Sequence, residues 1–232
     1  MSKISLSEEQ SEILKNVCEA VYTMDIAWRS FLYFFGSSQE RARFLSETSP
    51  AVSVLLGNLL WDATLTRIRA LTDQPKRRGN TNLSVGCLVD FCEPNDRKAY
   101  QSKFEMLQRN CEGSRRFASK HIAHFDLRTK LDPTTVTITR GQTTDAIDGI
   151  WAFLFSFHAD VLDTHICRDV VRPLPDERGF LELLYLGKQS QAARLEEFKQ
   201  RFLAHKDFNS ALPGPRDDLP DWLRSNVDQN AD

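Results

Sequence analysis

The sequence has no long apolar run, and in particular no stretch of about 18 apolar residues that would span a bilayer. Its first ten residues, Met-Ser-Lys-Ile-Ser-Leu-Ser-Glu-Glu-Gln, contain no apolar signal segment. The five cysteines are odd in number and include no Cys-x-x-Cys pair, which excludes a disulfide framework. Cys87 and Cys92 lie on an apolar helical pattern and are predicted to be buried, reduced thiols. These absences predict a cytoplasmic protein without membrane contact.

Several catalytic motifs are also missing. There is no Gly-x-Ser-x-Gly, no glycine-rich loop for phosphate and no cysteine in a reactive setting, so we expect no cofactor. The formal net charge is -2, so a nucleic-acid contact would have to come from a local basic patch. The loop Lys76-Arg77-Arg78 is one such patch, although solvent-exposed loops often have this composition.

What the sequence does contain is helical periodicity. Apolar residues recur at helical spacing over residues 7–36, 50–73, 95–123 and 143–170. Ser7 and Gln10 have the spacing of a capping box. Proline at position 50 suits the first residue of a helix. The pattern predicts an all-α fold, an antiparallel bundle of four main helices joined by short loops.

The remaining segments predict a second part of the chain. The Thr-rich section 127–143 is expected to be a short strand or an extended insertion. Residues 177–205 have the pattern of one or two further helices, and residues 206–232 form an acidic, proline-containing tail. We therefore expect a helical bundle over residues 1–172 and a C-terminal helical appendage with a mobile tail over residues 173–232.

The most informative stretch is 115–126, Arg-Arg-Phe-Ala-Ser-Lys-His-Ile-Ala-His-Phe-Asp, at the end of a predicted helix. Arg116, Lys120 and His124 follow one another at spacing four and therefore share a helix face. Histidine moves protons near neutral pH, and the two cations stabilise an anionic phosphate transition state. The same stripe is also what a solvated basic helix end looks like, because the helix dipole favours cations there.

Metal-free RNA cleavage requires a base for the 2′-OH and a cation for the scissile phosphate. An arginine four to six residues ahead of a histidine provides both, and His121 meets that spacing with Arg116 or Arg115. A metal site is the alternative. Its donors would be His121, His124 and Asp126, completed by His158 or His165. Because the last two lie on an apolar helical pattern, they more often serve as core histidines.

Two segments resemble a known family. Ser119–Asp126 resembles the signature of HEPN domains of the abortive-infection branch, in which Arg-Asp-Lys-x-Ile-Ala-His-x-Asp ends a bundle helix. Leu65–Asp73, followed by Asn82-Leu-Ser84 behind a basic loop, is similar to the Arg-Leu-x-Asp helix end of that branch. The resemblance covers residues 10–170 and implies a small all-α bundle, usually a homodimer whose motif helices meet.

The family contains metal-independent ribonucleases of toxin–antitoxin or phage-defence systems, and also catalytically inactive members that bind RNA, nucleotides or protein partners. The resemblance implies His124 as general acid/base with His121 as its candidate partner, and Arg116 and Lys120 as phosphate ligands. Asp126 would orient a ring or the helix end. The implied partners are an RNA substrate and a cognate antitoxin or regulatory protein.

The sequence departs from the family pattern at one position. Aligning His124 with the family histidine places Ala118 where the catalytic arginine belongs. Arg116 lies two positions upstream and projects within about 80° of His124 around the helix axis. Either Arg116 replaces the missing arginine, or Arg116 or Arg115 works with His121, or the site is inactive and the fold serves binding.

Overall fold

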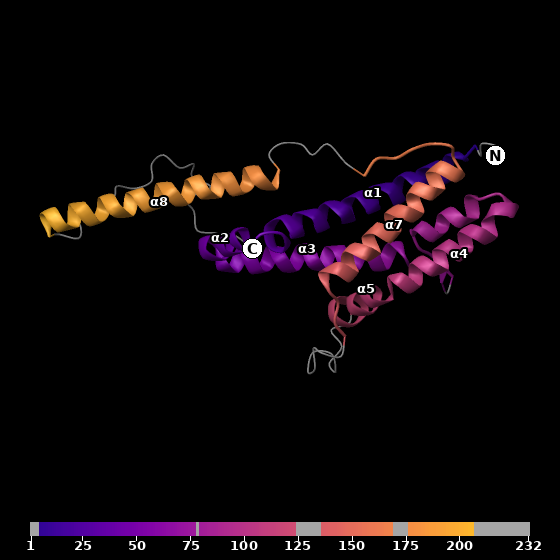
Figure 1. Cartoon of the computed structure of the whole chain (residues 1–232), viewed down its shortest axis with the longest axis horizontal. Coiled ribbons are helices and arrows are strands. Elements are labelled where there is room, and N and C mark those ends of the chain that lie inside the picture. The colour runs from indigo at the N-terminus through magenta and orange to yellow at the C-terminus, as the bar shows by residue number, and fades with distance from the viewer. Residues whose placement is uncertain (1–4, 78, 124–135, 169–175, 207–232) are drawn as a thin grey trace, which may run out of the picture. The chain divides into compact units, whose positions relative to one another are not determined.

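The structure is a computed structural model that describes residues 5–77, 79–123, 136–168 and 176–206. His124, Asp126 and Arg78 lie outside the described residues, as does the predicted tail, so the expectations for them stay predictions. The chain divides into two units, Met1–Arg172 and Pro173–Asp232. The first is a bundle of helices, which confirms the predicted all-α fold (Figure 1).

The first helix, α1 (Glu8–Phe31), begins at the predicted capping box. The Ser7 hydroxyl accepts from the Gln10 amide at 3.2 Å, and the Gln10 side-chain oxygen accepts from the Ser7 amide at 2.9 Å. The helix continues into a π-helical turn, η1 (Leu32–Gly36), and ends at the predicted glycine. Its apolar stripe is buried at Val17, Val21, Met24 and Trp28.

The next two helices form an antiparallel layer with α1. Helix α2 (Gln39–Thr48) is short, and α3 (Pro50–Leu71) begins at the predicted proline and packs along α1. A small antiparallel hairpin follows, formed by the two-residue strands β1 (Lys76–Arg77) and β2 (Asn80–Thr81). Gly79 takes φ +85°, the left-handed conformation that such tight turns require. Lys76 and Arg77 of the basic segment therefore form the first strand of a hairpin.

The predicted helix 95–123 is not continuous. It consists of α4 (Pro94–Asn110), a turn at Cys111, α5 (Glu112–Phe117) and a π-helical turn, η3 (Ala118–Ala123). It is preceded by the 3₁₀ helix η2 (Val85–Phe91), which buries Cys87, while Cys92 follows buried at its end. Both thiols are buried, as predicted.

The last helix of the bundle, α7 (Arg140–Asp160), has a second capping box between Thr139 and Gln142. The predicted end near Val170 is wrong. The chain turns at Asp163, which has φ +52°, and the Thr164 amide bonds back to the His158 carbonyl at 2.9 Å. His165 is consequently exposed in the segment after the helix and is not the core histidine that the pattern predicted.

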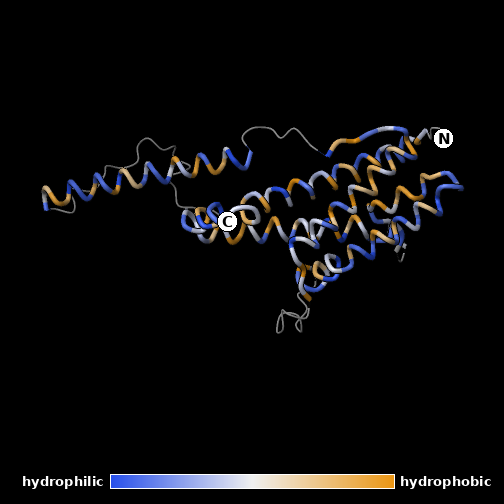
Figure 2. The backbone as a smooth tube through the Cα atoms, in the orientation of Figure 1, coloured by the Kyte–Doolittle hydropathy of each residue, from blue (hydrophilic) through white to orange (hydrophobic). Residues whose placement is uncertain are grey.

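The core lies between α1, α3, α4 and α7, the four main helices of the predicted bundle. Figure 2 shows hydrophobic residues recurring along each of these helices between hydrophilic ones. This spacing turns one face of each helix inward. The largest fully buried side chains are Trp28, Trp151, Phe104, Phe157, Met24, Leu65, Ile68, Leu71, Leu88, Ile147, Ile150 and Leu154.

In the second unit, α8 (Glu177–His205) is one continuous helix capped by Asp176, whose carboxylate accepts from the Arg178 and Gly179 amides. Several of its large apolar side chains are exposed, namely Phe180, Leu183, Tyr185, Leu186, Leu195, Phe202 and Leu203. Throughout the described part of the chain, every helix falls short of the length and apolarity that a membrane span needs.

Candidate functional site

The motif segment, α5 and η3, lies against α3. Phe117 of α5 makes an edge contact with Trp61 of α3, with ring centroids 6.5 Å apart. Beyond the end of α3, the Gln108 amide of α4 donates to the Thr72 carbonyl at 2.8 Å, and Gln74 donates to the Gln108 side chain at 3.0 Å. These bonds hold the C-terminal end of α3 beside the segment that carries the motif.

An ion pair joins the two segments that carry the family resemblance. Arg115 of the motif segment donates from Nη2 to Asp73 Oδ1 at 2.9 Å, just after α3, and its Nη1 lies 3.8 Å from Glu112. The side chains of the pair are only 23% and 22% exposed. Because its guanidinium is bonded to a carboxylate, Arg115 is poorly placed to hold a substrate phosphate.

A groove of about 250 Å³ lies at this junction. Its cations outnumber its carboxylates by four to two, so the lining is net positive. Arg116 and Lys120 are exposed there, while Arg69 and Ser119 are half-buried. The residues that line the groove are Arg69, Asp73, Glu112, Arg115, Arg116, Ser119 and Lys120. A net positive groove with three arginines and a lysine, one arginine being paired with Asp73, is suited to a phosphate group.

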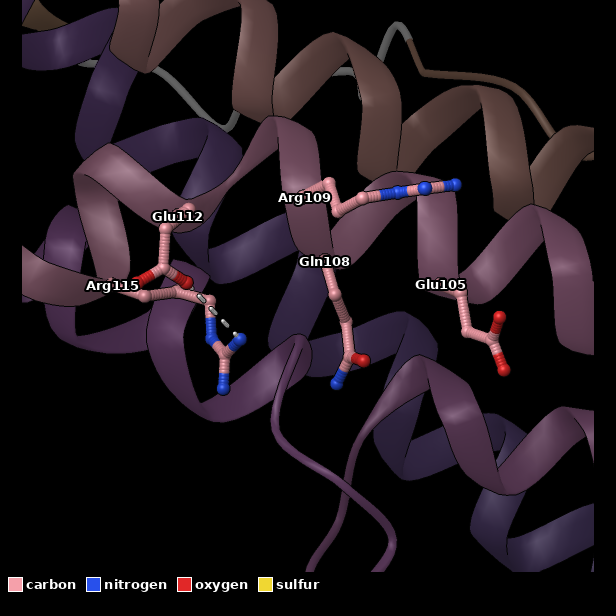
Figure 3. Close-up of a pocket in the computed structure, with 5 residues that line it drawn as sticks. All are labelled: Glu105, Gln108, Arg109, Glu112 and Arg115. Atoms are coloured by element: carbon pink, nitrogen blue, oxygen red, sulfur yellow. Dashed lines mark ion pairs between the residues drawn. The ribbon is translucent and has the colours of Figure 1, made fainter.

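A second, wider hollow of about 550 Å³ adjoins the groove and shares Glu112 and Arg115 with it (Figure 3). In Figure 3, Arg115 and Glu112 point toward one another at one end, while Arg109 and Glu105 lie farther along α4. Gln108 is the fifth lining residue. Two carboxylates balance two guanidiniums, so this hollow has no charge preference for an anionic ligand.

His121 is held from two sides. Its Nε2 lies 2.9 Å from the Val136 carbonyl oxygen, and because a carbonyl only accepts, Nε2 must carry the proton. The ring stacks on Phe117 with centroids 4.2 Å apart and planes 18° apart. The described structure therefore separates His121, which is bonded to backbone, from Arg116 and Lys120, which line the groove.

The position of the missing family arginine is part of the core. Ala118 is 1% exposed and begins the π-helical turn of η3. Turns of this kind occur frequently at functional sites. An arginine at position 118 would bury its charge, so the bundle is packed around alanine there.

The metal-site alternative gains no support from the described residues, among which no three His, Cys, Asp or Glu side chains gather. His158 is buried, and its two ring nitrogens meet the Cys18 sulfur at 3.8 Å and the Thr164 hydroxyl at 3.0 Å. Burial lowers the pKa of His158 and favours its neutral form. His158 is thus the core histidine that the pattern predicted.

Two buried cysteines of the bundle, Cys92 and Cys111, are unsuited to nucleophilic chemistry. Burial raises the pKa of the Cys92 thiol to about 11 and that of Cys111 to about 12. A thiol reacts as the thiolate, so neither group is activated near neutral pH.

Comparison with known proteins decides the family. The model of the AbiU2 family of HEPN domains matches residues 7–155. The chain belongs to this family. The match includes both segments that meet at the Arg115–Asp73 pair, and it confirms the resemblance to abortive-infection HEPN domains. No curated protein and no solved structure matches the chain.

The sequence-based site omitted Arg69 and Ser119, although both line the groove. Arg69 lies in the last turn of α3, which ends at Leu71, and Asp73 follows two residues later. Both belong to the stretch Leu65–Asp73 that carries the family resemblance, but nothing local indicates which other helix they meet. Ser119 had no signal beyond its place in the motif.

Proposed function

We propose that this AbiU2-family protein is a metal-independent endoribonuclease of a toxin–antitoxin or phage-defence system. The observation that supports the proposal best is the meeting of the two family segments in one net positive groove, with Arg69 beside Arg116 and Lys120. Cations of this kind bind the phosphodiester backbone of RNA. The groove needs no metal to supply positive charge to the scissile phosphate.

In the proposed reaction, His124 takes the proton of a ribose 2′-OH, and the oxygen attacks the adjacent phosphorus. The bond from phosphorus to the 5′-oxygen breaks, and that oxygen receives the proton back from the His124 imidazolium as it leaves. Arg116 replaces the missing motif arginine and, with Lys120, stabilises the negative charge of the phosphorane-like transition state. Asp126 orients the histidine ring or the helix end. The products are a 2′,3′-cyclic phosphate and a 5′-OH.

The burial of Ala118 favours a second candidate function, a catalytically inactive HEPN module. Such a module would bind a nucleic acid, a nucleotide or a protein partner through the same groove. It needs the phosphate ligands Arg116 and Lys120, but not His124.

Both candidate functions, ribonuclease and inactive binding module, are tested by assaying RNA cleavage in EDTA. The assay compares the purified wild type with the variants His124→Ala and Arg116→Ala. Cleavage that persists in the chelator and disappears in both variants supports the ribonuclease. Arg43→Ala is the matched control, because Arg43 is 79% exposed on α2 and pairs with Glu47 outside the groove. RNA binding without cleavage, weakened by Arg116→Ala and unaffected by His124→Ala, supports the binding module.

Two further proposals concern partners. As in other HEPN domains, we propose a homodimer that brings the motif segments together, which light scattering of the purified protein would detect.

We propose residues 173–232 as a separate domain that docks a cognate antitoxin or regulatory protein. The exposed apolar side chains of α8 support this role, and Leu183→Glu, at a side chain 66% exposed, should weaken the docking without unfolding the bundle.

A further inference from the structure

One hydrogen bond joins His121 of the motif segment to Val136, where the described chain that leads to α7 begins. The described chain stops at Ala123 and resumes at Val136, and the His121–Val136 bond joins its two sides at 2.9 Å. Val136 is 8% exposed, and the Ile138 side chain reaches α5, where a Cβ on Gly113 would lie 3.4 Å from it. The extended chain that leads back to α7 therefore contacts the motif segment at alternate residues, Val136 and Ile138.

The His121 ring is fixed by more than this bond. It stacks on Phe117, and Phe117 contacts Trp61, which in turn lies 5.7 Å from the ring of the buried Trp28. A stacked ring at the end of such a row has little freedom to rotate. A general acid or base needs a nitrogen within hydrogen-bond reach of the substrate. Because Nε2 of His121 is bonded to backbone, Nδ1 is the one ring nitrogen through which His121 could exchange a proton with a substrate.

We propose that His121 is a positioning residue rather than the proton-transfer partner of His124. It fastens Val136, at the start of the described chain that leads to α7, to the motif helix. The catalytic consequence rests on the proposed ribonuclease function. The fastening itself does not, and it is tested separately.

Two amide substitutions in the full-length protein distinguish the roles. In His121→Gln, the side-chain amide reaches the position of Nε2 and donates to the Val136 carbonyl, whereas in His121→Asn the amide is too short to reach it. Neither amide titrates. A positioning role predicts that the Gln variant retains cleavage within about threefold with an unchanged pH profile, and that the Asn variant loses about fivefold or more.

Limited trypsin digestion gives a readout that needs no RNA. The rate of cleavage after Arg128 and Lys130, mapped by mass spectrometry, compares how accessible these two peptide bonds are to the protease in each protein. Without the bond to Val136, the Asn variant should be cleaved about fivefold faster, the factor that removal of one neutral hydrogen bond produces. The Gln variant should digest at the wild-type rate.

The outcomes separate cleanly. If the wild type cleaves no RNA but the Asn variant alone is digested faster, the ribonuclease proposal fails and the fastening role stands. If the Gln variant is as inactive as His124→Ala, and one limb of the pH profile disappears with it, His121 transfers protons and the positioning role is wrong. Equal digestion of all three proteins would also overturn it.

Discussion

Arg115 Nη2 lies 2.9 Å from Asp73 Oδ1, and this pair connects the motif segment to the end of α3. The two residues are 42 positions apart in the sequence. The groove at this contact is lined by Arg69, from the last turn of α3, together with Arg116 and Lys120. The two neighbouring arginines differ in their surroundings, since Arg115 is bonded to a carboxylate and Arg116 is exposed.

Breaking the pair should destabilise the bundle. A double-mutant cycle with Arg115→Ala and Asp73→Ala should give a coupling free energy of about 1 kcal/mol, because both side chains are mostly removed from water. Urea unfolding measures it. The exposed pair Arg43–Glu47 is the matched control and should couple by about 0.3 kcal/mol. Equal coupling in the two pairs would show that the Arg115–Asp73 contact has no special structural weight.

Arg69 should contribute one phosphate contact to RNA binding. For a single-stranded RNA, Arg69→Ala should reduce the slope of log affinity against log salt by about 0.7, the amount that one phosphate contact contributes. Fluorescence anisotropy at several salt concentrations measures the slope. Arg43→Ala should leave it unchanged, and a slope that Arg69→Ala does not alter would remove Arg69 from the interface.

Restoring the family arginine should damage this protein. Ala118→Arg places a charged side chain at a position that is 1% exposed, and should cost about 3 kcal/mol or more of unfolding free energy. Thermal unfolding measures the loss of stability in Ala118→Arg and in Ala118→Ser. The difference between the two variants separates the effect of charge and size from that of polarity alone. A stable Ala118→Arg variant with increased RNA cleavage would show that Arg116 is not the replacement proposed above.

Gly86 should be irreplaceable where Gly57 is not. A Cβ on Gly86 would lie 2.6 Å from Phe104 Cζ and 2.9 Å from Pro75 Cγ, so Gly86→Ala should destabilise the bundle by about 1–3 kcal/mol. On Gly57 of α3 the nearest atom, Phe35 Cε2, would lie at an ordinary 3.6 Å. Gly57→Ala should therefore be neutral or stabilising, because alanine favours the helix. Denaturant titration compares the two variants.

Stability should fall in mild acid through His158. Burial lowers the pKa of His158 in the folded state below its ordinary value of 6.5, so the unfolded chain binds the proton more readily. The contribution of His158 to stability is therefore complete above pH 6.5 and declines as the pH falls from 6.5 toward the folded-state pKa. In urea titrations at about pH 7.5 and about pH 5.5, His158→Gln should lose less stability than the wild type. Identical losses would exclude His158 as a source of acid sensitivity.

The sequence by itself determined the fold class and the four main helices. Ser7 and Pro50 mark helix starts through local chemistry, and an apolar face at helical spacing has to be buried. The same local reasoning failed at Cys111 and Asp160. A turn at Cys111 ends α4, and α7 ends at Asp160, three residues before the left-handed Asp163, although apolar residues continue at the same spacing.

Only the tertiary structure decided which of the predicted groups meet. His121 and Arg116 looked alike as partners for RNA, because sequence spacing specifies a helix face but not what lies opposite it. His121 is bonded to Val136, 15 residues away, and Arg115 to Asp73, 42 residues away. Packing of α3 against the motif segment leaves Arg116 and Lys120 at the groove, beside Arg69, which the sequence-based site had omitted.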